Sequence, residues 1–235
     1  DKRFEKIEVS KYIDAKSLII SHFHSDHFSC LDLVSDKSLS IEKLIVPKLP
    51  IEHWFADGIK AFLAIQLYYL GKKTGFMDTD IIDKIIKKNQ TPFTIERKCQ
   101  DESFIAAKNE FKVLWPKTSY LTDKTSIDNA MKDIASILDD NKPFREFYEK
   151  VLKSKFLNED IDSVQIEDVL TEIENFDISI TSEQEKLLEN ANLKLRNAAN
   201  DICLAFEDKD ETFLSLGDLS QSALNLICKE KFTEE

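Results

Sequence analysis

The stretch of sequence that decides the fold is LIISHFHSDHF, from Leu18 to Phe28. It holds three of the chain's four histidines, and an apolar, β-branched run at 14–21 leads into it. Such a run is typical of a buried strand. We therefore expect the histidines to lie in the loop that follows the carboxyl end of this strand.

The spacing of the histidines predicts a metal site. Neutral imidazole binds zinc, iron or manganese, and an aspartate oxygen suits the harder of these ions. In an extended loop His22 and His24 point to the same side and can hold one ion, while Asp26 and His27 come one turn later and can reach a second. Two ions about 3.5–4 Å apart can share a hydroxide, a strong nucleophile near neutral pH. The simpler alternatives are a surface loop with unrelated histidines and a single structural metal.

Composition narrows the class of protein. A length of 235 residues suits one large domain or two small ones, and the presence of only four glycines favours a helix-rich chain. The net charge of −12 argues against a dominant nucleic-acid-binding face but leaves room for a local basic channel. Four cysteines without ligand spacing indicate reduced thiols in a cytoplasmic protein. No apolar run is as long as a membrane span and no signal peptide is visible, so we expect no membrane partner.

Apolar periodicity predicts strands near both ends of the chain and helices in the middle. The expected strands cover 14–21, 44–46, 109–116, 201–207 and 211–217, and the last two form a hairpin across an acidic turn. The expected helices cover 53–71, with Gly71 as C-cap, and then 77–89, 126–140, 143–156, 164–176, 181–200 and 219–229. Ser182 and Glu185 match a capping box.

These elements predict an α/β chain of α+β character in three parts. Residues 1–121, with a helical segment at 51–90, form the N-terminal part of one domain. Residues 194–235 form its C-terminal part. Residues 122–193 form a large helical insertion between two strands of one sheet.

The histidine stretch resembles the HxHxDH signature of the metallo-β-lactamase fold, including the apolar strand before it. The resemblance implies an αββα sandwich, incomplete in this chain, with the metals at the edge where the two sheets meet. It implies that His22 and His24 bind the first metal and that Asp26 and His27 bind the second. It also implies a catalytic role for Asp26, which would orient the bridging water or accept its proton.

A second stretch, ETFLSLGDLSQSALNLI at 211–227, resembles the strand-Gly-Asp-helix element of the same fold. The resemblance implies that Asp218 bridges the two metals. A carboxylate at a strand end can donate one oxygen to each ion. The alternative for Gly217-Asp218 is an ordinary turn in which Asp218 is the N-cap of the following helix.

The order of FKVLWP (111–116) and NDICLAFEDKDETFLSLGD (200–218) resembles the hydrolase domain of the competence protein ComEC and its soluble relatives. The sequence departs from that pattern where Phe28, Ser29 and Cys30 replace the family's Gly-Gly, and where a further histidine is expected after Gly-Asp. His53, the remaining histidine, is expected on a helix surface or in the core. The missing ligands are therefore expected outside this sequence, unless the two-metal centre is incomplete.

The resemblance implies a metal-dependent hydrolase with two divalent ions, zinc first and manganese or iron as alternatives. Its expected substrate is a phosphodiester or nucleic acid, in a setting such as bacterial defence or another accessory system, with a protein partner bound through the helical insertion. One alternative is a degenerate scaffold that acts as an interaction module, and another is a small-molecule ester or lactone hydrolase. The lysine pairs 72–73 and 87–88 are expected on solvated faces, and Trp54 and Trp115 in the core or at a partner contact.

Overall fold

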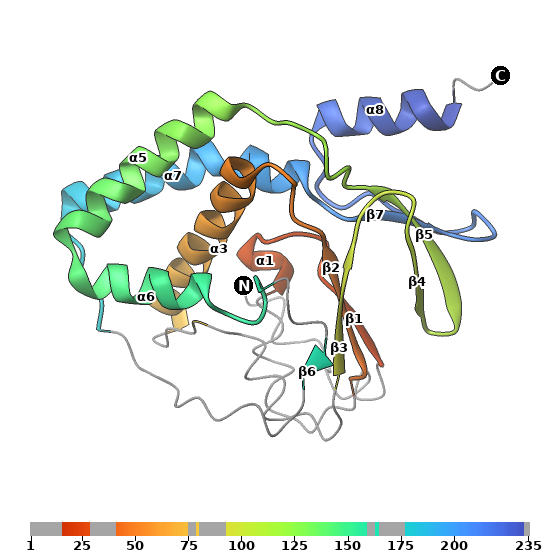
Figure 1. Ribbon diagram of the computed structural model, residues 1–235, viewed down its shortest axis with the longest axis horizontal. Helices are drawn as coiled ribbons and strands as arrows, with labels where there is room; N and C mark the ends of the chain where they lie inside the picture. Colours follow the sequence, from red (N-terminus) through yellow and green to blue (C-terminus); the bar gives the residue numbers. More distant parts are fainter. Residues whose placement is uncertain are drawn as a thin grey trace.

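The computed structural model describes residues 16–28, 41–74, 79, 93–158, 163–164 and 177–232. Within this part the chain is a mixed α/β structure with two four-stranded sheets and several long helices (Figure 1). Cys30, the lysine pair 87–88, nearly all of the expected helix at 77–89 and most of that at 164–176 lie outside the described residues.

The first sheet begins with the strand that precedes the histidines. Its strands are β1 (Ser17–Ile19), β2 (Lys43–Pro47), β3 (Phe93–Lys98) and β6 (Ser163–Val164), in the spatial order β1-β2-β3-β6. Strands β1, β2 and β3 are parallel, and β6 is antiparallel to β3. The strand expected at 44–46 is confirmed as part of β2, the strand expected at 14–21 is confirmed only over Ser17–Ile19, and β3 was not predicted. The prediction that Val164 lies in a helix is wrong, because Val164 pairs with Phe93 in the sheet.

The second sheet is antiparallel throughout. It consists of β4 (Ser103–Ala106), β5 (Asn109–Trp115), β7 (Ala205–Asp208) and β8 (Leu214–Ser215), in that spatial order. The strand at 109–116 and the hairpin of β7 with β8 are confirmed, but β4 was not predicted. The strand expected from residue 201 begins only at Ala205 because Asp201 still belongs to the preceding helix.

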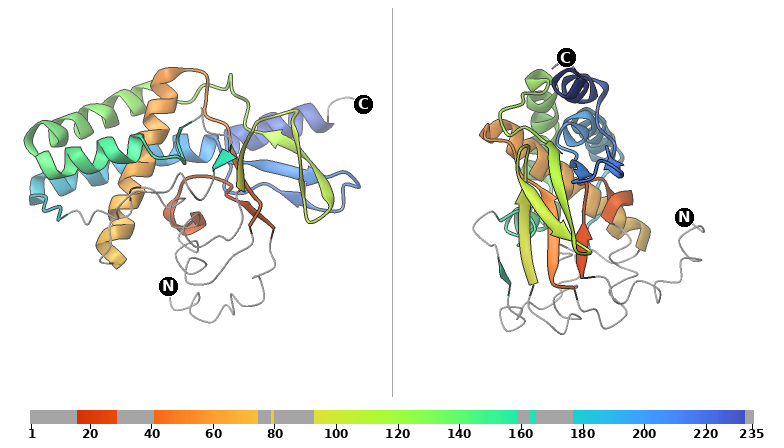
Figure 2. Two further views of the ribbon diagram at one scale, coloured as in Figure 1. Left: turned by 60° about the horizontal axis from the view of Figure 1, so that its bottom comes forward. Right: turned by 90° about the vertical axis from the view of Figure 1, so that its right-hand side faces the viewer.

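Six helices complete the described residues: α1 (Ser25–Phe28), α3 (His53–Thr74), α5 (Lys124–Asp140), α6 (Lys142–Leu152), α7 (Ser182–Asp201) and α8 (Gln221–Phe232). Helices α3, α5, α6 and α7 gather on one side of the molecule, away from the second sheet (Figure 2). Their apolar faces form the largest core, which includes Phe62, Phe144, Phe147, Leu188 and Leu195.

Several helix ends differ from the prediction, such as that of α6, which stops at Leu152 and not at residue 156. Helix α3 continues through Gly71 to Thr74, so Gly71 as a C-cap is wrong. Lys72 extends the helix and pairs with Glu185 of α7 at 2.9 Å, a contact that local sequence does not reveal. The capping box of α7 lies one residue earlier than expected, because Thr181 and Gln184 form it.

The two sheets meet through a smaller apolar core that joins Ile45 of β2 to Val113 and Phe206 of the second sheet and to Leu204, just before β7. Strands β5 and β7 are adjacent in that sheet, although α5, α6, β6 and α7 separate them along the chain. Helix α8 packs near this sheet (Figure 1), over a third cluster that includes Trp115, Ala205 and Ala223. Among the described helices, none combines the length and the apolar character that crossing a bilayer requires.

Candidate metal centre

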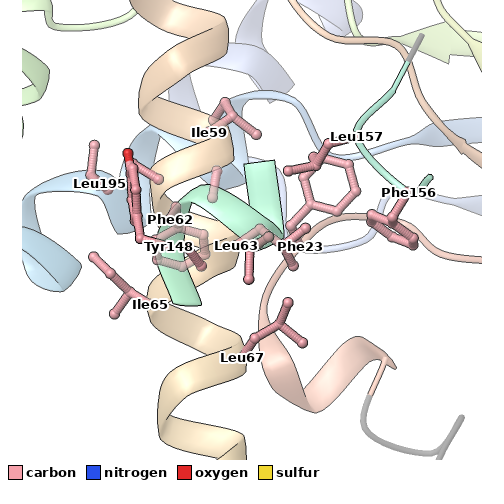
Figure 3. Close-up of a cluster of buried hydrophobic side chains, with 14 of the residues drawn as sticks. Phe23, Ile59, Phe62, Leu63, Ile65, Leu67, Tyr148, Phe156, Leu157 and Leu195 are labelled. Carbon is pink, nitrogen blue, oxygen red and sulfur yellow. The ribbon is translucent and has the colours of Figure 1, made fainter. Parts of the chain in front are cut away.

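The histidine motif occupies the loop between β1 and α1 and the helix itself. Phe23 is buried, and its ring lies 5.1 Å from that of Phe156, beside α3 (Figure 3). The chain bends at His22 and Phe23, and the imidazoles of His22 and His24 lie beside each other with their ring centroids 4.6 Å apart. Phe28, also fully buried, anchors the other end of the motif.

Three potential ligand groups converge at this loop. The ligand atoms of His22, His27 and Asp218 all lie within 4.8 Å of one another. Asp218 Oδ2 is 3.3 Å from His27 Nε2 and 3.9 Å from His22 Nε2. Two imidazoles and a carboxylate are donors that zinc and manganese accept.

The backbone before Asp218 explains how this carboxylate reaches the histidines. Gly217 has a φ of +52°, and a Cβ at this position would collide with Sγ of Cys203. The N–H of Asp218 donates to the same sulfur at 3.3 Å. One residue after Cys203, the N–H of Leu204 donates to the carbonyl of Ser21 at 2.6 Å. Cys203 therefore lies between the two segments that carry the potential ligands.

Gly217 and Asp218 lie in a turn, but Asp218 is not the N-cap of α8. Helix α8 begins at Gln221, and the N–H of Ala223 donates to Oγ of Ser220 at 3.2 Å. That is the hydrogen bond of an N-cap residue, so Ser220 caps the helix. The carboxylate of Asp218 remains beside His22 and His27.

The hydroxyl of Ser21 lies between two imidazoles. Its Oγ is 3.1 Å from Nδ1 of His22 and 3.1 Å from Nδ1 of His27. A hydroxyl oxygen has two lone pairs and can accept a hydrogen bond from both rings. Protonation of each ring on Nδ1 leaves the Nε2 lone pair available for a metal, and it is the Nε2 atoms that approach Asp218.

Burial keeps the first two histidines neutral at physiological pH. Desolvation lowers the pKa of His22 to about 3, with a further contribution from the positive charges that His27 and His24 would carry. Desolvation likewise lowers the pKa of His24 to about 4. Neutral imidazole is the form that binds metal, so proton competition at these two residues is weak.

Several nitrogen atoms at the site lack a partner. Nε2 of His22 and both ring nitrogens of His24 are buried and have no hydrogen-bond partner among the described residues. Buried polar atoms without partners are rare because their desolvation is not compensated. A divalent ion would satisfy such lone pairs, so the residues present fit a metal.

The remaining motif residues adjoin the cluster. His24 lies beside His22 and also contacts the ring of Phe62 at 4.7 Å. The side chain of Asp26 is 76% exposed, and its Oδ2 is 3.9 Å from Nε2 of His27. His24 thus extends the His22 end of the site and Asp26 extends the His27 end, with Asp218 near both His22 and His27.

Three residues for which the sequence predicted no role at the site support it. Ser21 and Cys203 contact His22, and buried Gln66 of α3 accepts a hydrogen bond from the N–H of Ser25 at 3.0 Å. Gln66 is a polar residue within the apolar run AFLAIQLYYL, which is the signal that could have revealed it. Burial raises the pKa of Cys203 to about 11, so it is a neutral thiol at pH 7.

The other candidates lie elsewhere. His53 is exposed at the first residue of α3, and it is not part of the described cluster. The indole N–H of buried Trp115 donates to the carbonyl of Asp201 at 2.7 Å. Trp54 is partly buried, with Nζ of Lys124 5.5 Å from its ring centroid.

The fold and the site together define a mixed α/β protein with a histidine–aspartate cluster where the first strand ends. No family model, no curated protein and no solved structure matches the chain.

Proposed function

We propose that this chain is a metal-dependent hydrolase of the metallo-β-lactamase fold, ComEC-like branch, that holds two divalent ions. Zinc is the first choice, with manganese and iron as alternatives. The observation that carries the proposal is the convergence of His22, His27 and Asp218 beside buried imidazole nitrogens without partners. A solvated surface loop has no reason to bury such atoms.

The arrangement of the elements supports the sandwich. The motif follows β1 of the mostly parallel sheet, and Asp218 follows β8 of the antiparallel sheet. The two sheets share an apolar core, and the Leu204–Ser21 hydrogen bond joins the loop after β1 to the segment that enters β7. A site built where two sheets meet is the arrangement that the resemblance implies.

Each side chain then has a role that its surroundings support. Divalent ions bound here would supply a strong nucleophile from water near neutral pH and positive charge for the developing oxyanion. His22 and His24 would bind one ion, and Asp26 and His27 the other. Asp218 would bind both. Asp26 would also orient the attacking water or accept its proton, and Ser21 would fix the imidazole tautomers.

The proposed substrate is a phosphodiester, in a small molecule or in nucleic acid. This choice follows the ComEC-like order of FKVLWP and the Gly-Asp stretch. Lactones and thioesters are the alternative substrates that the test must include. The helices between β5 and β7 are the proposed surface for a protein partner.

Metal titration of the full chain tests the proposal. We expect two equivalents of zinc or manganese to bind the wild type, and His27→Asn and Asp218→Asn each to lose at least one equivalent. His53→Asn is the matched control because it removes an exposed histidine outside the cluster. Hydrolysis of bis(p-nitrophenyl) phosphate, single-stranded DNA, a lactone and a thioester then assigns the substrate class.

Absence of metal binding by the wild type would contradict the proposal and favour an interaction module. Equal metal binding by the wild type and Asp218→Asn would also contradict it. Activity on the lactone or thioester alone would be compatible with the proposed fold but would contradict the phosphodiester substrate.

A further inference from the structure

One glutamine joins the motif to the helices. The side chain of Gln66, on α3, accepts a hydrogen bond from the N–H of Ser25 and donates one to Oδ1 of Asn192 on α7 at 2.7 Å. Ser25 directly follows His24. Helix α7, which lies after β5 and β6 in the chain, is therefore fixed close to the histidine loop.

Two contacts between α3 and α7 show how these helices are oriented relative to each other beside the site. Lys72 follows Gln66 in α3, whereas its partner Glu185 precedes Asn192 in α7. The two helices therefore run antiparallel. Residues four apart share a helix face. One turn further, in the other direction, come Phe62 on α3 and Arg196 on α7. The ring of Phe62 lies 4.7 Å from that of His24. From this alignment of the helices we place Arg196 on the same side of the site.

The electrostatics of His24 agree with this position. Arg196 lies close enough for its positive charge to act on the imidazole of His24. Arg196 is exposed, and within the described part of the chain it has no ion-pair or hydrogen-bond partner. Neighbouring Lys194, in contrast, pairs with Asp133 at 2.5 Å.

We infer that Arg196 binds a phosphate group of the substrate beside the histidine motif, so that the helix after β6 supplies part of the substrate site. This inference rests on the proposed function and adds a residue of the helical segment to it. A guanidinium presents a planar fork of donors that matches two phosphate oxygens, and it keeps its charge at any working pH. In a chain of net charge −12, such a cation gives an anionic substrate a local attraction that the overall charge does not.

Titration of inorganic phosphate tests the inference, with the full chain in zinc-loaded and metal-free form. We expect Arg196→Gln to weaken phosphate binding at least about tenfold, the scale of a charge-assisted hydrogen bond. Arg196→Lys should give an intermediate loss because it keeps the charge and loses the fork. Zinc stoichiometry should not change in either variant, which separates a lost substrate contact from a lost metal site.

Lys186→Gln is the matched control, since it removes one exposed positive charge from the same helix, nearer its start. It should retain wild-type phosphate affinity, and an equal loss in both variants would overturn the inference. No phosphate binding by the wild type, or equal affinity of the wild type and Arg196→Gln, would also overturn it. Acetate bound through Arg196 as tightly as phosphate would overturn the phosphate class.

The two proposals fail separately. If the wild type takes up no zinc, the proposed function fails. Phosphate binding by the metal-free chain that depends on Arg196 would still support the inference, and its absence would overturn it.

Discussion

The sulfur of Cys203 occupies the space that a side chain at Gly217 would need. The same sulfur accepts the N–H of Asp218, so one thiol both requires glycine at position 217 and holds the backbone of the carboxylate that follows. The position of Asp218 therefore depends on a residue that is not itself part of the ligand cluster.

The first prediction concerns this contact. Gly217→Ala should weaken zinc binding at least about tenfold, because the methyl group displaces Asp218 and the positive φ adds about 1–2 kcal/mol of strain. Isothermal titration with zinc measures the affinity. In a Cys203→Ala background, which already lacks the hydrogen bond to Asp218, Gly217→Ala should cause a smaller additional loss because the collision is gone. An equal additional loss in both backgrounds would show that the thiol is not the obstacle.

The second prediction concerns the hydroxyl between the two imidazoles. Ser21→Ala removes the hydroxyl that lies 3.1 Å from Nδ1 of both His22 and His27, so zinc affinity should fall about 10–100-fold. Ser154→Ala provides the comparison, because its hydroxyl is buried and has no hydrogen-bond partner among the described residues. That variant should bind zinc as the wild type does. Similar losses in both variants would refute a specific role for Ser21.

The third prediction concerns the bridge between the motif and the helices. Gln66→Leu leaves the N–H of Ser25 without its acceptor and should lower the free energy of unfolding by about 1–3 kcal/mol. Urea unfolding measures the change. Asn192→Asp keeps an oxygen that accepts from Gln66, so its stability should remain within about 1 kcal/mol of the wild type. The bridge is unimportant if Gln66→Leu is as stable as this control.

The fourth prediction concerns pH. The folded pKa of His22 is about 3 and that of His24 about 4, both below the ordinary value of 6.5. Below pH 6.5 the unfolded chain takes up protons at these residues and the folded chain does not, so stability is complete above pH 6.5 and is lost as the pH falls. Metal-free protein should lose about 1 kcal/mol for each histidine between pH 7.5 and 5.5.

Urea unfolding of the metal-free chain across this range measures the loss. His22→Asn should remove about half of the pH dependence, whereas His53→Asn should preserve the contribution of the two buried histidines. An unchanged pH dependence in His22→Asn would contradict the assignment of this loss to His22.

Local sequence predicted the elements that carry a strong pattern of their own. The run before the histidines is apolar and β-branched, and the helices at α5, α6 and α7 each have an apolar face. The ends of these helices were harder to predict, because two neighbouring residues can both match the pattern of an N-cap. Both Thr181 and Ser182 stand three residues before a Gln or Glu, and the structure uses Thr181.

Two of the missed strands, β3 and β4, have sequences that conceal the pattern. Strand β3 carries Glu96 and Lys98, and Glu96 is paired with Lys43 of β2 at 2.6 Å, a compensation that only the fold provides. The hairpin from β4 to β5 turns at Ala107 and Lys108, which both have positive φ. Glycine or asparagine is usual there, so the turn carries no recognisable signal.

From local sequence, only those site residues that lie a few positions apart in the chain could be predicted. The density of histidines pointed to His22 and His27, but Asp218 entered through a family resemblance, because no local rule links residues so far apart. The roles of Ser21 and Gln66 depend on which side chains the fold brings beside them. Hydrogen bonds of this kind follow from the tertiary structure, and the sequence pattern around each residue does not contain them.

The contact of Cys203 with His22 joins residues 181 positions apart. Closing such a long loop is entropically costly and slow, so this part of the molecule should be among the last to assemble. During synthesis the histidines leave the ribosome long before Asp218 exists. High-affinity metal capture would therefore require that Asp218 has been synthesised and has folded against the histidines, and the time course of metal uptake would report this late step of folding.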